Sequence, residues 1–233
     1  MRVDLKRRAA AEAVGTALLL ATVVGSGIMG ERLASGNVAI ALLANTLATA
    51  AALIALILTF GPVSGAHFNP VVTMADASQN GLAWRDVPAY VIAQVIGAFV
   101  GVASADTMFD EPIFAASTHI RSGTGQLVSE VIATFGLLCV IWGCSRRRPS
   151  ATPFAVGAYI AAAYWFTAST SFANPAVTLA RAATNTFAGI RPVDVPYFMV
   201  AQVFGAIMAT ALFRWLVPAA PENAPAEAIE AKT

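Results

Sequence analysis

Charged residues are scarce in this sequence. Asp, Glu, Lys and Arg make up 12% of the chain, whereas 58% of its residues are hydrophobic and the mean hydropathy is +0.69. Soluble globular domains carry about 25% charged residues, so this composition excludes an ordinary soluble domain. The formal net charge of +1 gives no indication of a nucleic-acid partner. The composition instead predicts a membrane protein with several spans.

Residues that serve nucleophilic or metal chemistry are also few. The chain has two histidines, His67 and His119, and two cysteines, Cys139 and Cys144. No cluster of metal ligands and no Ser-His-Asp set is evident, so we expect no enzyme, no metal site and no cofactor. The two cysteines lie in one apolar segment about 140° apart around a helix, so we expect them to be unpaired core residues.

Long apolar runs, by contrast, are abundant. Runs of roughly 18 to 25 residues are long enough to cross a bilayer as helices, and we expect six spans, at about 9–30, 38–60, 87–107, 127–145, 152–169 and 193–217. The first run is too long for a signal-peptide core and has no clear cleavage site, so we interpret it as a span. We expect one domain over residues 1–217. Residues 218–233 are rich in Ala, Pro and Glu and are expected to form a disordered cytoplasmic tail.

The basic residues predict an orientation in the membrane. With six crossings, ten of the 14 Lys and Arg residues fall on the side of both termini, and the other four are Arg32, Arg121, Arg181 and Arg191. Basic residues accumulate in cytoplasmic loops. We therefore expect a multi-pass protein of the plasma (inner) membrane with both termini in the cytoplasm.

Two short segments interrupt the apolar pattern, and each contains Asn-Pro. His67-Phe68-Asn69-Pro70-Val71-Val72-Thr73 follows the second span, and Asn174-Pro175-Ala176-Val177-Thr178 follows the fifth. Asn is a favourable N-cap and Pro fits the first turn, so each segment predicts the start of a short helix, over about 69–79 and 174–186. We expect two re-entrant half-helices whose positive N-termini meet near the bilayer midplane.

The two halves of the chain repeat one another. Glu12–Thr16 aligns with Glu130–Thr134, and Ala93–Ala98 aligns with Ala201–Ala206. Three spans per repeat is an odd number, so the halves insert in opposite orientations as an inverted repeat, over about 9–107 and 127–217. Small residues four positions apart predict close helix packing, and they are Gly97 with Gly101 and Gly205 with Ala209.

The two Asn-Pro motifs among six spans make the sequence resemble the aquaporin, or major intrinsic protein, family. The segment from Ser64 to Thr73 is similar to the first signature of the family, and Asn174-Pro175-Ala176 is similar to the second. The resemblance covers about residues 9–217. It implies an all-α membrane protein in a lipid bilayer, a right-handed bundle of six transmembrane helices plus two re-entrant half-helices, with one pore per subunit and usually a homotetramer.

The sequence departs from the family pattern at two positions. Val71 stands where the family has Ala, and Val177 stands where its water channels have Arg. Loss of that Arg is typical of the AqpS-type aquaglyceroporins of bacterial arsenic-resistance operons, which this chain resembles. The resemblance implies facilitated diffusion of small uncharged solutes: glycerol-like polyols, arsenite and antimonite as neutral hydroxides, and water. It also implies a role in arsenic efflux.

The candidate site residues follow from the motifs. At the pore centre, Asn69-Pro70 and Asn174-Pro175 either donate amide N–H groups to a permeating oxygen or merely cap their helices. Val177 lies three residues beyond Asn174, about 4.5 Å further out on nearly the same face. The spacing in the family adds the rest of a wide, uncharged outer constriction, namely Thr49, Ala162 and Ser171. Thr178 stands where glycerol channels often have Asp.

Four further side chains have two possible roles each. Glu12 and Glu130 lie inside spans at matching positions, where they either hold the re-entrant loops or carry protons. His67 either lines the inner mouth or bonds to a loop carbonyl. Arg181 lies one turn beyond Val177; tethering a loop or reaching the headgroups is favoured over a displaced filter arginine. If the carboxyls carry protons, the alternative function is a proton-coupled secondary transporter built on the same inverted repeat.

Overall fold

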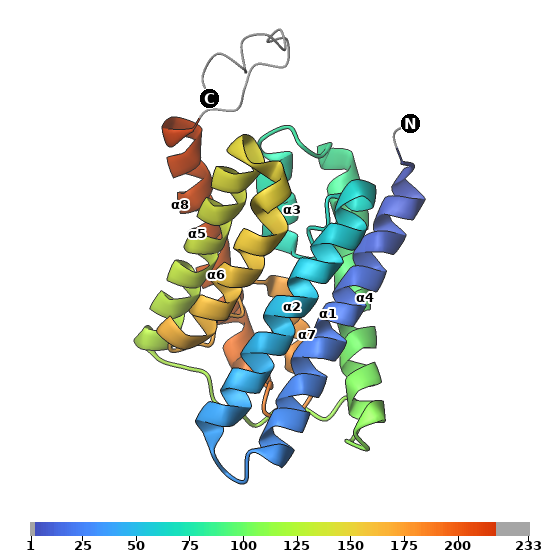
Figure 1. Ribbon diagram of the computed structural model, residues 1–233, viewed down its shortest axis with the longest axis vertical. Helices are drawn as coiled ribbons and strands as arrows, with labels where there is room; N and C mark the ends of the chain where they lie inside the picture. Colours follow the sequence, from blue (N-terminus) through green and yellow to red (C-terminus); the bar gives the residue numbers. More distant parts are fainter. Residues whose placement is uncertain (1–2, 218–233) are drawn as a thin grey trace, which may run out of the picture.

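The protein is a bundle of helices, seen here in a computed structural model that describes residues 3–217 (Figure 1). The six long helices are α1 (Leu5–Leu33), α2 (Val38–Ser64), α4 (Val87–Met108), α5 (Thr124–Arg147), α6 (Thr152–Phe166) and α8 (Val195–Leu216). The two short helices are α3 (Pro70–Ala77) and α7 (Pro175–Arg181), and three 3-10 turns are η1 (Trp84–Asp86), η2 (Pro149–Ala151) and η3 (Pro192–Asp194). The predicted fold class is confirmed. The predicted tail, 218–233, lies outside the described residues.

The fifth predicted span, 152–169, extends too far toward the C-terminus. Its helix, α6, has 15 residues and ends at Phe166, a length of about 22 Å at 1.5 Å per residue. Within residues 3–217, five helices are long and apolar enough to cross a membrane, judged by length and composition only, and α6 is not among them. The helix ends early because the chain turns into the second re-entrant loop, where Thr170 and Ser171 have left-handed backbone conformations with φ of 59° and 51°.

The two short helices begin at the predicted residues and end earlier than predicted. Asn69 and Asn174 are the N-caps, and each is followed by Pro in the first turn. We expected helices to about residues 79 and 186, but α3 ends at Ala77 and α7 at Arg181. The residues that follow form hydrogen-bonded turns, such as Ala183 N–H to the Ala180 carbonyl oxygen at 3.0 Å, which close each helix sooner. Cap signals therefore located the starts well and the ends poorly.

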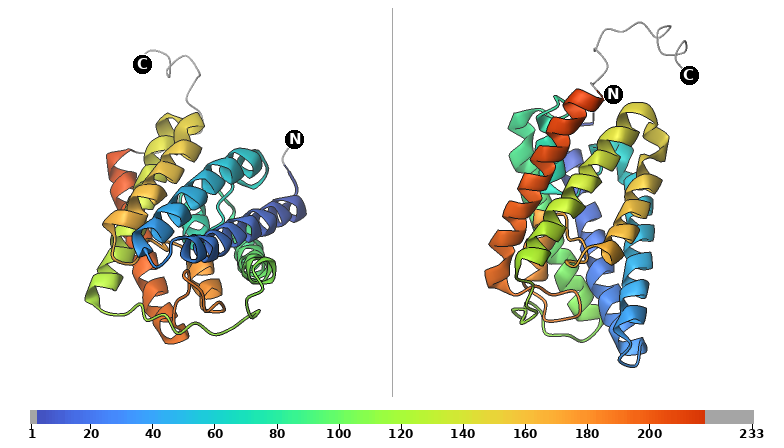
Figure 2. Two further views of the ribbon diagram at one scale, coloured as in Figure 1. Left: turned by 60° about the horizontal axis from the view of Figure 1, so that its bottom comes forward. Right: turned by 90° about the vertical axis from the view of Figure 1, so that its left-hand side faces the viewer.

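The arrangement of the helices follows the inverted repeat. Figure 1 shows the start of α1 and the end of α8 at one end of the bundle, with α3 toward that end and α7 toward the other. The right-hand view in Figure 2 shows the same arrangement from another side. In the first half α1 packs along α4, and in the second half α5 packs along α8. The two pairs are equivalent elements of the two repeats.

Small residues make these pairings possible, as the spacing predicts. A Cβ atom at Gly97 or Gly101 would overlap the carbonyl oxygens of Ala13 and Ala17 on α1, and one at Gly205 would lie 2.5 Å from that of Val131 on α5. The helix backbones therefore touch, which is the usual way helices associate in lipid. The two cysteines are free, as expected.

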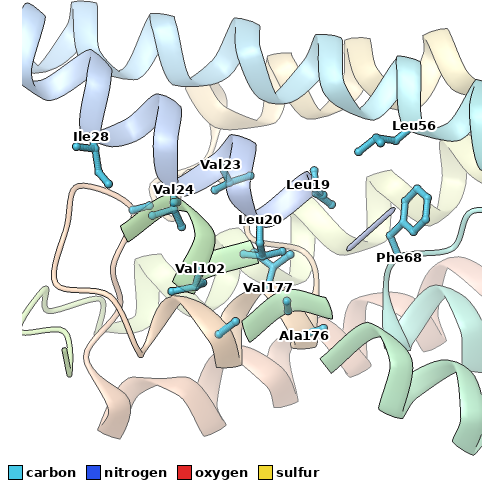
Figure 3. Close-up of a cluster of buried hydrophobic side chains, with 14 of the residues drawn as sticks. Leu19, Leu20, Val23, Val24, Ile28, Leu56, Phe68, Val102, Ala176 and Val177 are labelled. Atoms are coloured by element: carbon cyan, nitrogen blue, oxygen red, sulfur yellow. The ribbon is translucent and has the colours of Figure 1, made fainter. Parts of the chain in front are cut away.

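One buried apolar cluster joins α7 to the first repeat. Figure 3 shows side chains of α1, among them Leu20 and Val24, against Val102 of α4 and against Ala176 and Val177 of α7. The second half-helix is thus held by apolar contacts with helices of the other repeat, so its position depends on both halves of the chain.

Candidate functional site

The two Asn-Pro motifs brace each other at the centre of the bundle. Each Asn side-chain oxygen caps its own helix: Asn69 Oδ1 accepts from Val71 N–H at 3.1 Å, and Asn174 Oδ1 accepts from Ala176 N–H at 3.0 Å. Each side-chain nitrogen donates to the opposite motif, Asn69 Nδ2 to the Ala173 carbonyl oxygen at 2.8 Å and Asn174 Nδ2 to that of Phe68 at 2.7 Å. An amide nitrogen carries two hydrogens, so one per Asn remains for a solute. The sequence does not reveal this cross-bracing.

Both intramembrane glutamates hold the loops that lead into the motifs. The fully buried carboxylate of Glu12 accepts four hydrogen bonds of 2.7 to 2.9 Å, from Ser64 Oγ, His67 N, Phe68 N and Gln94 Nε2. The fully buried carboxylate of Glu130 accepts three of 2.6 to 2.9 Å, from Phe172 N, Ala173 N and Gln202 Nε2. Loop N–H groups that point into the helix bundle of a membrane protein need such partners, because water does not reach them there. The residues before the two Asn, Phe68 and Ala173, have left-handed backbones with φ of 48° and 47°, a strained conformation that these bonds support.

Two glutamines complete these networks and were missed in the sequence. Gln94 Nε2 donates to Thr73 Oγ1 of α3 at 2.9 Å, and Gln202 Nε2 donates to Thr178 Oγ1 of α7 at 2.8 Å. Both glutamines are fully buried. Their signal was present, because each occupies the same place in the repeated Ala-Gln-Val segments.

A cavity of about 430 Å³ passes both motifs. Near the start of α1 and along α3, it is lined by residues such as Arg8, His67 and Asp76. It continues past Asn69 and Asn174 to a group of residues on the other side, which are Thr49, Ser171, Val177 and Arg181. The site residues of both repeats therefore share one cavity.

Three of the four predicted constriction residues line this cavity, and Ala162 does not. Thr49, Ser171 and Val177 are buried side chains at its wall. Ala162 is exposed on the other face of α6. The prediction was wrong in helical register. Ala162 is two positions from Ile160 and from Tyr164, which turns it about 200° around the helix axis from each of them. The α6 residues at the cavity wall include Ile160 and Tyr164.

Tyr164 changes the chemistry expected of the outer part of the cavity. Its hydroxyl donates to Thr49 Oγ1 at 3.3 Å. The expected ring of two hydroxyls therefore gains a third, with an aromatic wall. Val71, the other departure from the family pattern, is buried in the core, and its neighbour Val72 lines the cavity instead.

His67, which precedes α3, lines the cavity. Its Nδ1 lies 3.2 Å from Thr73 Oγ1, and its Nε2 lies 3.6 Å from Asp76 Oδ2. The ring nitrogens thus face a hydroxyl and a carboxylate, where a loop carbonyl was the alternative expectation. Within the part of the chain that the structure describes, no group of three potential ligands could hold a metal ion.

Arg181 does not reach the membrane surface, which corrects one expectation. The residue is 3% exposed, its Nε donates to the Ala188 carbonyl oxygen, and its guanidinium carbon lies 3.4 Å from the centre of the Phe172 ring. It tethers a loop, as expected, and it also lines the cavity beside Val177. A helical position does not reveal which way so long a side chain turns.

The spans also hold a third buried acid that we did not weigh in the sequence. Asp106, near the end of α4, is fully buried. Its Oδ1 accepts from Thr184 Oγ1 at 2.9 Å, and its Oδ2 has no partner among residues 3–217. It lies away from the cavity wall, so it belongs to the packing of the loop after α7.

Comparison with known proteins agrees with this architecture. The family model described as major intrinsic protein matches residues 1–171 and 147–232. The chain is 55% identical over 219 residues to a protein named aquaglyceroporin AqpS of Rhizobium meliloti, covering 94% of each chain. It is 30% identical over 214 residues to the probable aquaporin NIP7-1 of Arabidopsis thaliana, covering 88% of this chain and 74% of that one.

A solved structure shares the fold. The X-ray structure of the aquaglyceroporin from Plasmodium falciparum superimposes with a TM-score of 0.71 and 22% sequence identity, covering 98% of this chain and 100% of that one. The helix arrangement, the paired Asn-Pro half-helices and the match along nearly the whole sequence lead to one conclusion: the chain belongs to the major intrinsic protein family.

Proposed function

We propose that this protein is a transmembrane channel of the aquaglyceroporin type, through which small uncharged solutes diffuse down their gradients. The observation that carries the proposal is the single cavity that passes both Asn-Pro motifs. At its centre, two helix N-termini and two Asn side chains provide N–H donors. Such an arrangement binds the oxygen of a neutral solute and repels cations.

The proposed solutes are glycerol-like polyols, arsenite and antimonite as neutral hydroxides, and water. Support comes from the small side chains Thr49 and Val177 at the outer part of the cavity, together with the hydroxyls of Ser171 and Tyr164. Small side chains leave room for solutes larger than water, and hydroxyls exchange hydrogen bonds with solute oxygens. A relative named aquaglyceroporin, 55% identical, favours the same solute class. Arsenic efflux is the proposed physiological use.

The proposed pore centre consists of Asn69-Pro70 and Asn174-Pro175, and the proposed constriction consists of Thr49, Ser171 and Val177, with Ile160 and Tyr164 in place of Ala162. We assign Glu12 and Glu130 to holding the re-entrant loops, because each accepts hydrogen bonds from two backbone N–H groups of its loop. Their remaining donors bond in turn to the loop or to the half-helix that follows it. His67 is assigned to the inner mouth.

The protein is a multi-pass membrane protein, as its family and its apolar helices require. We propose that it lies in the plasma membrane with both termini in the cytoplasm, because six crossings put ten of its 14 Lys and Arg residues on the side of the termini. We further propose that residues 1–217 act as one channel domain, that the chain assembles as a homotetramer, and that it performs no enzymatic reaction.

Solute flux into vesicles tests the proposal. Purified protein in liposomes should speed swelling in glycerol and uptake of arsenite at neutral pH, relative to protein-free liposomes. Flux should rise in proportion to the solute gradient, and an ionophore that collapses the proton gradient should leave it unchanged. Uptake that saturates and stops when the proton gradient collapses would instead establish the proton-coupled transporter.

A further inference from the structure

Arg181 presents a positive charge to the outer part of the cavity. Val177 and Arg181 are four residues apart on α7, one helical turn, and both line the cavity. The Arg181 guanidinium is oriented by the bond from Nε to the Ala188 carbonyl oxygen and by the Phe172 ring. Within residues 3–217 that bond is the one hydrogen bond the guanidinium makes, so its two terminal nitrogens keep their hydrogens for a solute.

A second guanidinium, that of Arg121, lies near the same Phe172 ring as the first. Arg121, in the segment that joins the two repeats, donates from Nε to the Gly189 carbonyl oxygen at 2.8 Å, and its guanidinium carbon lies 4.9 Å from the same Phe172 ring. Neither arginine forms a salt bridge within the described part of the chain. Arg121 does not line the cavity. Two guanidinium groups without a salt bridge therefore lie close to the Phe172 ring, and Arg181 is the one that lines the cavity.

The hydroxyl of Ser171, which lines the cavity together with Arg181, has no hydrogen-bond partner within residues 3–217. Its hydroxyl oxygen is buried, the residue is 3% exposed, and no residue in the described range hydrogen-bonds to it. The side chain nevertheless lines the cavity together with Arg181. A buried hydroxyl normally has a partner, so an unsatisfied one at a cavity wall indicates a group that bonds to the contents of the cavity.

We propose that Arg181 is a specificity-determining residue of this channel, which excludes cations at the outer end while it donates hydrogen bonds, with Ser171, to the oxygens of neutral solutes. The inference rests on the proposed channel function. It also explains how the channel can have Val177 where water channels of the family have Arg. The positive charge lies one turn further out, at Arg181, so the constriction at Thr49 and Val177 stays wide while the outer end of the cavity still repels cations. A hydroxylated solute meets donors at Arg181 first and at Asn174 next.

The test compares two solutes of the same shape and different charge, urea and the guanidinium ion. At an effective dielectric constant of about 20, the repulsion between two like charges roughly 10 Å apart lowers the occupancy of the cavity by a cation about tenfold. The wild-type channel should pass urea and exclude guanidinium. In Arg181→Gln, guanidinium flux into vesicles should rise about tenfold, while urea flux should change much less.

Two further variants separate charge from structure. Arg181→Lys keeps the charge and loses the planar group that stacks on Phe172, so it should exclude guanidinium as the wild type does. Arg32→Gln removes a charge from the same end of the bundle, at a half-exposed residue outside the cavity wall, and should also behave as the wild type. The unfolding temperature of each variant in detergent shows whether the fold is retained.

The outcomes are distinct. Guanidinium flux that rises in Arg181→Gln alone supports the inference. The inference is overturned if the wild type passes guanidinium as fast as urea, if Arg181→Gln excludes it as before, or if Arg181→Lys admits it as Arg181→Gln does. In all three cases, urea and glycerol flux through the wild type would still support the proposed channel function. Wild-type vesicles that pass no neutral solute would refute the proposed channel function itself.

Discussion

Replacing Glu12 by Gln should loosen the first re-entrant loop, although the two side chains have nearly the same shape. The four donors around Glu12 are divided between its oxygens: Oε1 accepts from Ser64 Oγ and His67 N, and Oε2 accepts from Phe68 N and Gln94 Nε2. Gln has one oxygen, so in either orientation its NH2 group faces one of the two backbone N–H groups. The Ser64 hydroxyl or the Gln94 amide can rotate to accept from it, and the backbone N–H cannot.

The loss of stability follows from the number of backbone N–H groups that lose their acceptor. One buried backbone N–H without an acceptor costs about 1–3 kcal/mol, so Glu12→Gln should destabilise the fold by about that amount. Glu12→Ala removes the acceptor of both backbone N–H groups and should cost about 2–6 kcal/mol. For a soluble domain of this size, 1 kcal/mol corresponds to a shift of roughly 2–4 °C in unfolding temperature, which gives the scale of the expected effect.

Thermal unfolding in detergent measures this effect, and glycerol flux per folded protein in vesicles measures its consequence. Glu31→Gln is the matched control, because Glu31 lies on the same helix and is exposed. We expect the wild type and Glu31→Gln to have the highest unfolding temperature, Glu12→Gln a lower one, and Glu12→Ala the lowest. If Glu12→Gln unfolds at the wild-type temperature, the carboxylate does not hold the loop through both oxygens and the reasoning is wrong.

Three more experiments test the site. Val177→Arg with Thr49→Phe should narrow the outer constriction, so the ratio of glycerol flux to water flux in vesicles should fall; an unchanged ratio would remove both residues from the constriction. Asn174→Ala should lower glycerol flux per folded protein, because it removes a cap worth about 0.5–2 kcal/mol together with the bond to the first motif, and wild-type flux would contradict this. Ile160→Trp should block glycerol while Ala162→Trp should not; the reverse result would restore the register expected from the sequence.

The sequence by itself determined the framework of the protein. Apolar runs long enough for the bilayer identified the spans, because a membrane leaves few alternatives to a helix. Asn-Pro pairs identified the starts of both half-helices, since an N-cap acts on the residues next to it in the chain. Repeated Gly97 and Gly205 marked the close helix pairs, and the repeated Glu12 and Glu130 marked the loop networks.

The tertiary structure decided which side chains meet in the cavity. Helix α6 is apolar on all sides, so its sequence carries no periodicity to show that Ile160 and Tyr164 face inward and Ala162 outward. The cross-bracing of Asn69 and Asn174 joins residues more than 100 positions apart, and no local rule predicts it. The direction of the Arg181 side chain likewise depends on Phe172 and on a loop carbonyl, contacts that exist only once both repeats are packed.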